Sequence, residues 1–197
     1  EKFLELTSQI GDIKTVSADF GFKGDLSPGS RVYEKALGGG SLLDVGIYPV
    51  YLSLISQGIP DKITAKARML ENQVDGFCSM VFSFKNGSTA KLESSIDTET
   101  PTEALIEGSK GMIKLYRRFH HAEKITLSQG DKTQTFHIKY KGNGYFHEIE
   151  EVNYCLLNNK TESEKLPLKT SMVLISILDE VRKEINLNYP QDIENVF

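Results

Sequence analysis

The chain has no tryptophan and only two cysteines among its 197 residues. Cys78 and Cys155 are far apart in the sequence, and each lies in an apolar pattern. This arrangement predicts two buried free thiols rather than a disulfide or a pair of metal ligands. Such cysteine usage fits a reducing compartment, so the expected location of the protein is the cytoplasm.

Long apolar runs and clustered positive charge are also missing. No apolar run of about 18 residues and no signal-type N-terminus occur, so the sequence gives no support for membrane insertion or export. The net charge is −4, and Lys and Arg form no basic stripe, which argues against a nucleic-acid partner. The densest basic patch contains Arg117, Arg118, His120 and His121. Adjacent histidines point apart on a strand, so no metal site is predicted there.

The composition that remains is that of an ordinary globular protein, with 39% hydrophobic and 25% charged residues. The length is sufficient to bury a real core, and no repeat, linker or low-complexity segment divides the chain. A single domain covering residues 1–197 is therefore expected. Residues 1–6 read like the middle of a helix, which suggests a piece cut from a longer protein.

Hydrophobic periodicity predicts mostly strands, followed by helices. Residues 13–23 alternate, and a second alternating run ends at the hairpin turn Asn86-Gly87. Short strands fit four later stretches, and two apolar stripes of helical period close the chain. The fold class predicted is α+β: an open, mainly antiparallel sheet of about six to eight strands with helices packed on one face. The later strands are expected at 103–107, 112–116, 124–128 and 133–140, and the stripes comprise Ile149, Val152 and Leu156, then Leu174, Leu178, Val181 and Ile185.

The most informative stretch is a glycine cluster followed by an acid and a phenol. Gly38, Gly39 and Gly40 precede Asp44, and Tyr48 follows four residues later. Adjacent glycines allow backbone conformations and close ligand approach that a Cβ would block. Residues four apart share one helix face, so Asp44 and Tyr48 can form a proton-handling site.

Two other interpretations of this stretch remain open from the residues alone. Pro49 predicts either a kinked helix or a helix that begins near Tyr48. Asp44 can simply cap that helix while Tyr48 packs. Arg68 alternates with apolar neighbours and faces away from the apolar side, where it can either bind a polar substrate or remain a solvated charge.

Stretches spread over essentially the whole chain follow the pattern of one family. They are residues 30–33, 37–50, the Asn86-Gly87 hairpin, 108–111 and the tail 145–190. Together they resemble the C-terminal domain of Gfo/Idh/MocA oxidoreductases. Members of that family carry an N-terminal Rossmann domain that holds NAD or NADP, and this chain has no G-x-G-x-x-G turn after a strand. The resemblance therefore implies the substrate-binding half of an NAD(P)-dependent oxidoreductase.

The resemblance also implies roles for particular residues. Asp44 and Tyr48 would be catalytic and line the substrate pocket beside the nicotinamide, with Gly38, Gly39 and Gly40 close to the cofactor. The substrate would be a sugar, a polyol or a related secondary alcohol, with Arg68 as a substrate-binding candidate. Independently of the resemblance, a wide sheet with helices on one side leaves its other face open, and a homo-oligomer through that face is expected. The alternative is a dimerisation or ligand-binding module without a redox role.

Overall fold

The computed structural model describes residues 2–142 and 144–193. In this part of the chain, eight strands form one sheet in the order β2-β3-β4-β1-β5-β6-β7-β8. Neighbouring strands are antiparallel except for β1 and β4, which are parallel. The strands are β1 (Ile13–Gly21), β2 (Lys62–Met69), β3 (Asp75–Ser83), β4 (Thr89–Ser95), β5 (Ala104–Gly108), β6 (Met112–Leu115), β7 (Lys124–Gln129) and β8 (Lys132–His137).

The predicted hairpin is confirmed. The turn at Asn86-Gly87 joins β3 to β4, which pair antiparallel with Ser83 opposite Thr89. Gly87 has a φ of 81°, a left-handed conformation that glycine adopts without a steric penalty. The local turn signal and the alternation of the two strands therefore point to the same structure.

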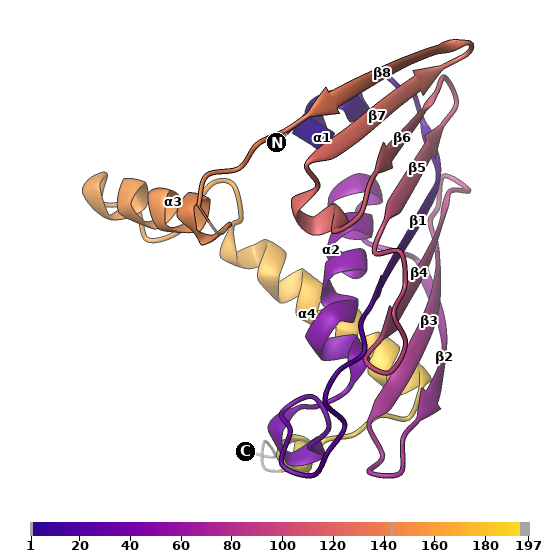
Figure 1. Cartoon of the computed structure of the whole chain (residues 1–197), viewed down its shortest axis with the longest axis vertical. Helices are drawn as coiled ribbons and strands as arrows, with labels where there is room; N and C mark the ends of the chain where they lie inside the picture. The colour runs from indigo at the N-terminus through magenta and orange to yellow at the C-terminus, as the bar shows by residue number, and fades with distance from the viewer. Residues whose placement is uncertain (1, 143, 194–197) are drawn as a thin grey trace.

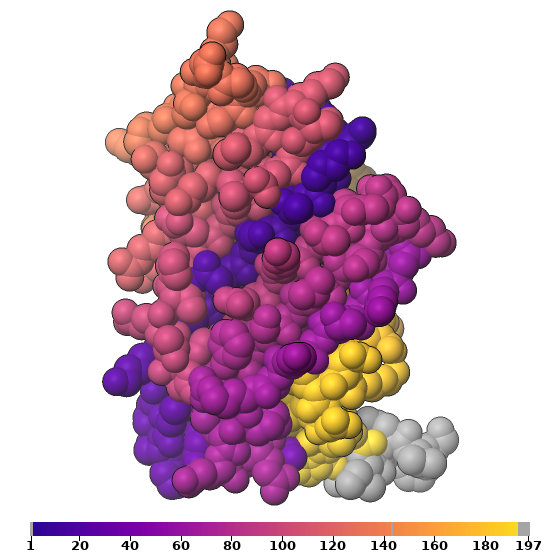
Figure 2. Space-filling view, turned by 90° about the vertical axis from the view of Figure 1, so that its right-hand side faces the viewer, coloured from indigo at the N-terminus to yellow at the C-terminus, as the bar shows by residue number. Residues whose placement is uncertain are grey.

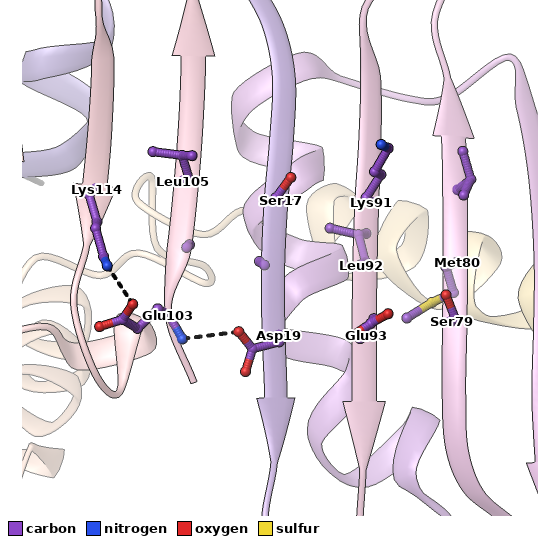
Figure 3. Close-up of a pocket in the computed structure, with 13 residues that line it drawn as sticks. Ser17, Asp19, Ser79, Met80, Lys91, Leu92, Glu93, Glu103, Leu105 and Lys114 are labelled. Atoms are coloured by element: carbon purple, nitrogen blue, oxygen red, sulfur yellow. Dashed lines mark hydrogen bonds and ion pairs between the residues drawn. The ribbon is translucent and has the colours of Figure 1, made fainter. Parts of the chain in front are cut away.

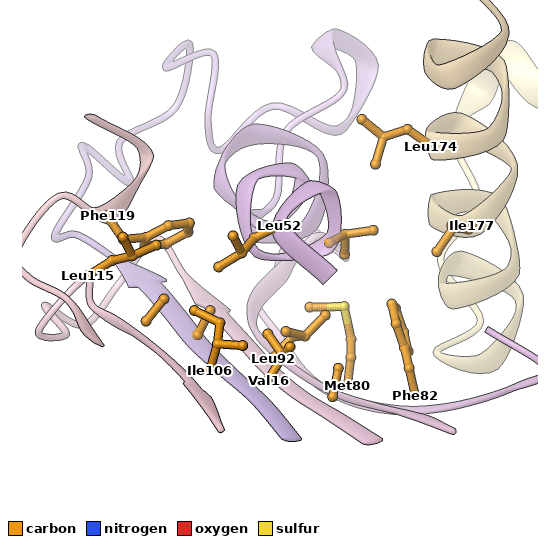
Figure 4. Packing of buried hydrophobic residues seen from close by; sticks show 14 of the residues in the cluster. Val16, Leu52, Met80, Phe82, Leu92, Ile106, Leu115, Phe119, Leu174 and Ile177 are labelled. Carbon is orange, nitrogen blue, oxygen red and sulfur yellow. The ribbon is translucent and has the colours of Figure 1, made fainter. Parts of the chain in front are cut away.

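Two helices cover one face of the sheet, as the fold prediction requires. These are α2 (Ile47–Gln57) and α4 (Leu168–Glu184), and both lie on the same side of the strands in Figure 1. Leu52 of α2 and Ile177 of α4 face the apolar side chains of the central strands in Figure 4. The open, mainly antiparallel α+β architecture is confirmed. The two remaining helices are α1 (Lys2–Thr7) and α3 (Tyr145–Leu157).

Helix α3 differs from the expectation that every C-terminal helix packs on the sheet. It projects away from the strands in Figure 1. Its apolar stripe is open, because Ile149, Val152 and Leu156 are 58%, 57% and 69% exposed. The stripe of α4 is buried as expected, with Leu178 only 1% exposed. Periodicity thus identified the apolar face of α3 correctly, but nothing in the described residues covers it.

No helix of the described residues lies on the opposite face of the sheet (Figure 1). Strands form most of the surface in Figure 2, with β1 running near its middle. A shallow hollow on this face is lined by Asp19 of β1, Lys91 and Glu93 of β4, and Leu105 of β5 (Figure 3). The predicted exposure of this face is confirmed.

Both cysteines are free and buried, as expected from their apolar surroundings. Burial raises the pKa of the Cys78 thiol, and the nearby Asp75 carboxyl adds to that shift. The segment Lys35–Gln57 is long and apolar enough by composition to cross a membrane, but 56% of its most apolar stretch is buried inside this domain. That burial is typical of a core helix in a folded domain.

Candidate functional site

The glycine cluster forms a tight loop that uses its own backbone donors. Gly38 and Gly40 have φ values of 73° and 114°, in the region that favours glycine. The N–H groups of Gly38, Gly39 and Gly40 donate to the carbonyl oxygens of Lys35, Glu34 and Val32 at 3.1, 3.0 and 2.9 Å. The loop is therefore closed on itself, and these three donors are occupied.

A buried acid on the sheet holds the start of the segment that follows this loop. Asp75, the first residue of β3, is fully buried, and its Oδ2 accepts hydrogen bonds from the Ser41 hydroxyl at 2.8 Å and the Leu42 N–H at 2.7 Å. The Ser41 hydroxyl also lies 2.9 Å from that of Ser94 on β4. Gly40 packs so closely on Asp75 that a Cβ at residue 40 would overlap Oδ1. The sheet thereby fixes where the segment carrying Asp44 begins.

Asp75 makes the stability of the domain depend on pH. Burial raises the pKa of its carboxyl to about 6, although its hydrogen bonds oppose that rise. Between pH values of about 4 and 6 the native state binds more protons than the unfolded state. The free energy of unfolding is therefore expected to fall by about 3 kcal/mol as the pH rises through this window.

The measurement is urea unfolding of the wild type and of Asp75→Asn across that pH range. Asparagine does not titrate, so the variant should lack this fall in stability while retaining an acceptor for the Leu42 N–H. Parallel stability curves for the two proteins would contradict the assignment to Asp75.

The C-terminal segment closes the loop from the other side. The Tyr189 hydroxyl donates to the Gly39 carbonyl oxygen at 2.7 Å, and the Gln191 side-chain amide donates to the Ala36 carbonyl oxygen at 2.7 Å. Burial raises the pKa of the Tyr189 phenol, so it acts as a neutral donor. The tail therefore contributes to the loop through hydrogen bonds that span some 150 residues of sequence.

Asp44 and Tyr48 lie on consecutive parts of a modified helix start. Leu42–Gly46 forms a π-helical turn, and α2 begins directly afterwards at Ile47. Pro49 lies in the first turn of α2, where its missing N–H is tolerated. The α-helical part does begin at Ile47, near Tyr48, but helical conformation already starts at Ser41 and continues through the π-helical turn, which takes the place of a sharp kink. π-Helical turns are frequently found at functional sites.

The Asp44 carboxylate has a cationic partner that the sequence analysis did not assign. Arg31 Nη2 lies 2.5 Å from Asp44 Oδ1, and the Asp44 side chain is only 15% exposed, whereas that of Arg31 is 63% exposed. A pair this open to solvent adds only about 0–1 kcal/mol of stability. Its main effect is to orient the carboxylate. The one signal in the sequence was the position of Arg31 within the 30–33 stretch of the family pattern.

Tyr48 lies partly exposed at the surface. Its side chain is 41% exposed, and its ring centroid lies 5.3 Å from that of Phe20 and 4.9 Å from that of His120. Phe20 and His120 stack on each other at 4.8 Å. Within residues 2–142 and 144–193 the Tyr48 hydroxyl has no hydrogen-bond partner. The ring is therefore held by neighbouring rings, while its hydroxyl is available to a bound molecule.

The expectation that His120 and His121 point apart is wrong. They belong to a 3₁₀ turn, Phe119–His121, rather than a strand, and their ring centroids lie 4.5 Å apart. The pKa of His120 is lowered to about 4, mainly by burial and to a smaller extent by the nearby positive charges of His121 and Arg118. Among the residues described, no group of three possible ligands could hold a metal ion.

Arg68 faces away from the core as expected, but its guanidinium already has a partner. Its two terminal nitrogens lie 2.5 and 2.9 Å from the carboxylate oxygens of Asp97. Arg68 lowers the pKa of the Asp97 carboxyl through this contact. A substrate-binding role for Arg68 stays a prediction, because a substrate would have to compete with Asp97.

Comparison with known proteins agrees with this fold. The family model of the GFO/IDH/MocA C-terminal domain matches residues 7–114. The chain therefore belongs to this family, and the resemblance inferred from the sequence is confirmed.

The similar relatives are oxidoreductases. The chain is 33% identical over 202 residues to the trans-1,2-dihydrobenzene-1,2-diol dehydrogenase of Xenopus tropicalis, covering 96% of the chain and 60% of the relative. The enzyme of the same name from Mus musculus is 34% identical, with 93% and 56% covered. The chain thus spans less than two thirds of these relatives.

Solved structures share the fold. A 3-ketoreductase from Actinomadura kijaniata in complex with NADP and TDP-benzene superposes with a TM-score of 0.80 at 20% identity, over 93% of this chain and 58% of that one. An aldose-aldose oxidoreductase from Caulobacter crescentus complexed with glycerol gives 0.78 at 18% identity, with the same coverage. At this level of identity the likeness concerns the fold alone.

Proposed function

We propose that this chain is the substrate-binding half of an NAD(P)-dependent oxidoreductase that acts on a sugar, a polyol or a related secondary alcohol, such as a dihydrodiol. The observation that carries the proposal is the partly exposed Tyr48, whose hydroxyl has no partner among the described residues and which follows Asp44 by one helical turn. The names of the relatives support the reaction class.

The chemistry explains why these two residues would serve. Oxidation of a secondary alcohol requires removal of its hydroxyl proton, which the Tyr48 phenolate would accept. A phenol has an ordinary pKa of about 10, so a nearby cation in the longer protein must lower it. Asp44, oriented by Arg31, would position the substrate hydroxyl or the phenol. The nicotinamide cofactor, when bound, supplies the hydride chemistry.

Steady-state assays of the longer protein test the proposal. NAD and NADP are each offered with sugars, polyols and dihydrodiols, and the appearance of the reduced cofactor is followed by absorbance. We expect turnover of at least one alcohol class. A dimerisation or ligand-binding module would reduce neither cofactor with any of them.

We predict that the chain on its own binds neither NAD nor NADP measurably. The dinucleotide diphosphate needs free backbone donors at a glycine turn, and those of Gly38, Gly39 and Gly40 are already donated within their own loop. Calorimetric titration of the chain with each cofactor is the measurement. Micromolar binding of either would show that the main cofactor site lies here, against the proposal that the rest of the protein supplies it.

We also propose that the helix-free sheet face pairs with a second copy. Val81 of β3 is 39% exposed on this face, and Leu105 lies between the charged residues of the hollow in Figure 3. Placing an unpaired carboxylate in a buried interface costs about 3 kcal/mol, so Val81→Glu should raise the dimer Kd roughly 100-fold.

Sedimentation of the wild type, Val81→Glu and a control, Ile59→Glu, is the measurement. Ile59 is 64% exposed but lies in the turn between α2 and β2, so its variant should remain dimeric. A wild type that stays monomeric at high concentration, or equal dissociation of the two variants, would count against pairing through the sheet.

A further inference from the structure

A second hollow adjoins Tyr48 and was not assigned any role above. It encloses about 370 Å³. Three segments that are distant in the sequence line it: the end of β1 at residues 20–22, the loop after β4 at residues 99–102, and the loop after β6 at residues 117–121. It therefore contains the short basic patch noticed in the sequence.

The arginines of this hollow differ from the others in the chain. Arg31 and Arg68 hold Asp44 and Asp97, and Arg182 holds two aspartates. Arg117 and Arg118 make no ion pair within the described part of the chain. Among the described residues that line the hollow, Glu99 is the only acid. Two guanidinium groups, each with five N–H donors, thus remain for a bound anion.

The backbone that carries these arginines is held in an unusual conformation. Arg118 has a φ of 60° and Thr102, on the facing loop, a φ of 54°. Positive φ is a genuine outlier for a β-branched residue and persists only where the surroundings enforce it. Here the Phe119 N–H donates to the Thr102 carbonyl oxygen at 3.1 Å, and the Thr102 N–H donates to the Asp19 carboxylate at 2.7 Å. The two loops are therefore fixed relative to each other.

The hollow also contains an unused polar group and a stacking surface. Thr100 Oγ1 is buried and has no hydrogen-bond partner in the described residues. Phe20 and His120 line the hollow, and both rings contact Tyr48. Because the pKa of His120 is lowered to about 4, its imidazole is neutral at pH 7. A molecule in the hollow would thus contact two rings that also contact the ring of Tyr48.

We propose that this hollow binds the carboxylate or phosphate of a small molecule that also carries a planar ring. Arg117 and Arg118 pair with the anion, while Phe20 and His120 contact the ring. If the molecule bound in the hollow is the alcohol substrate, that substrate is a ring-bearing acid or phosphate ester. This assignment of the substrate class rests on the proposed function. The same anion chemistry could come from a cofactor phosphate, so the test has one arm for each source.

The first arm measures binding without any reaction. Benzoate and its neutral amide, benzamide, are titrated into the protein while the imidazole signals of His120 and His121 are followed by NMR. We expect benzoate to shift these signals. The double variant Arg117→Gln/Arg118→Gln should weaken benzoate binding about 10- to 100-fold and leave benzamide unchanged.

The control variant removes two positive charges outside the hollow. Lys85→Gln/Lys132→Gln changes two lysines at the turns of other hairpins and should not alter benzoate binding. Equal weakening in both double variants, or no binding of benzoate to the wild type, would overturn the anion site.

The second arm uses the longer protein with an acid and its neutral amide, such as mandelate and mandelamide. The double arginine variant should raise KM for the acid while KM for the amide and the Kd for NADP stay unchanged. A raised Kd for NADP with unchanged KM for the acid would assign the anion to the cofactor and overturn the substrate assignment. Benzoate binding with no turnover of mandelate, mandelamide or any of the sugars, polyols and dihydrodiols would leave the anion site supported and contradict the proposed function instead.

Discussion

Replacing Tyr48 with phenylalanine in the longer protein is expected to lower turnover by about 10²- to 10⁴-fold. The variant keeps the ring that contacts Phe20 and His120 and loses only the hydroxyl. That hydroxyl has no protein partner in the described residues, so its loss should cost the fold little. A large effect on turnover with an unchanged thermal melt would therefore come from chemistry rather than from structure.

The control for this experiment is Tyr51→Phe on the same helix. Tyr51 packs against the hydrophobic core and has no assigned chemical role, so its variant should keep its turnover. Asp44→Asn should lower kcat/KM as well, because the carboxylate that Arg31 orients is lost. Near-normal turnover of Tyr48→Phe would mean that Tyr48 only packs.

Replacing Gly40 with alanine is expected to destabilise the domain by about 3 kcal/mol or more. Residue 40 has a φ of 114°, which strains any residue with a side chain, and its new Cβ would overlap the buried Asp75 carboxylate. Asp75 holds Ser41 and Leu42 at the start of the π-helical turn. The substitution should therefore also displace Asp44 and Tyr48.

Gly38→Ala is the matched control. Residue 38 also has a positive φ, 73°, but nothing lies within 4 Å of the position of a new Cβ. Gly38→Ala should lower the free energy of unfolding only by the cost of a left-handed backbone conformation, about 1–2 kcal/mol. Urea unfolding of both variants is the measurement. Equal destabilisation would mean that backbone strain alone, and not the contact with Asp75, explains the need for glycine at residue 40.

The sheet was predictable from the sequence because local signals and global pairing agree. Alternation of apolar residues placed β3 and β4, and Asn86-Gly87 placed the turn between them. The arrangement of α3 was not predictable. Its stripe at Ile149 and Val152 marks an apolar face, but the sequence does not show what covers that face, and these residues are exposed.

The candidate site was predictable only in part, because local sequence patterns do not reveal tertiary contacts. The spacing of Asp44 and Tyr48 marked the two residues as candidates, because residues four apart lie close together on a helical segment. Arg31, Asp75 and Tyr189 reach the site from distant parts of the chain through tertiary contacts that no local pattern reveals. The geometry around His120 was likewise hidden, because adjacent histidines were taken to point apart as they do on a strand, whereas the chain forms a 3₁₀ turn there.

The most direct test of the proton-transfer role of Tyr48 is the pH dependence of hydride transfer in the longer protein, measured in single turnovers for the wild type and Tyr48→Phe. The wild-type rate should rise with pH as the phenol becomes able to accept the substrate proton. The variant should be slower and should lack this rise, while its affinities for substrate and cofactor stay unchanged. A variant that keeps the wild-type rate and pH profile would contradict the assignment of Tyr48 as the residue that handles the substrate proton.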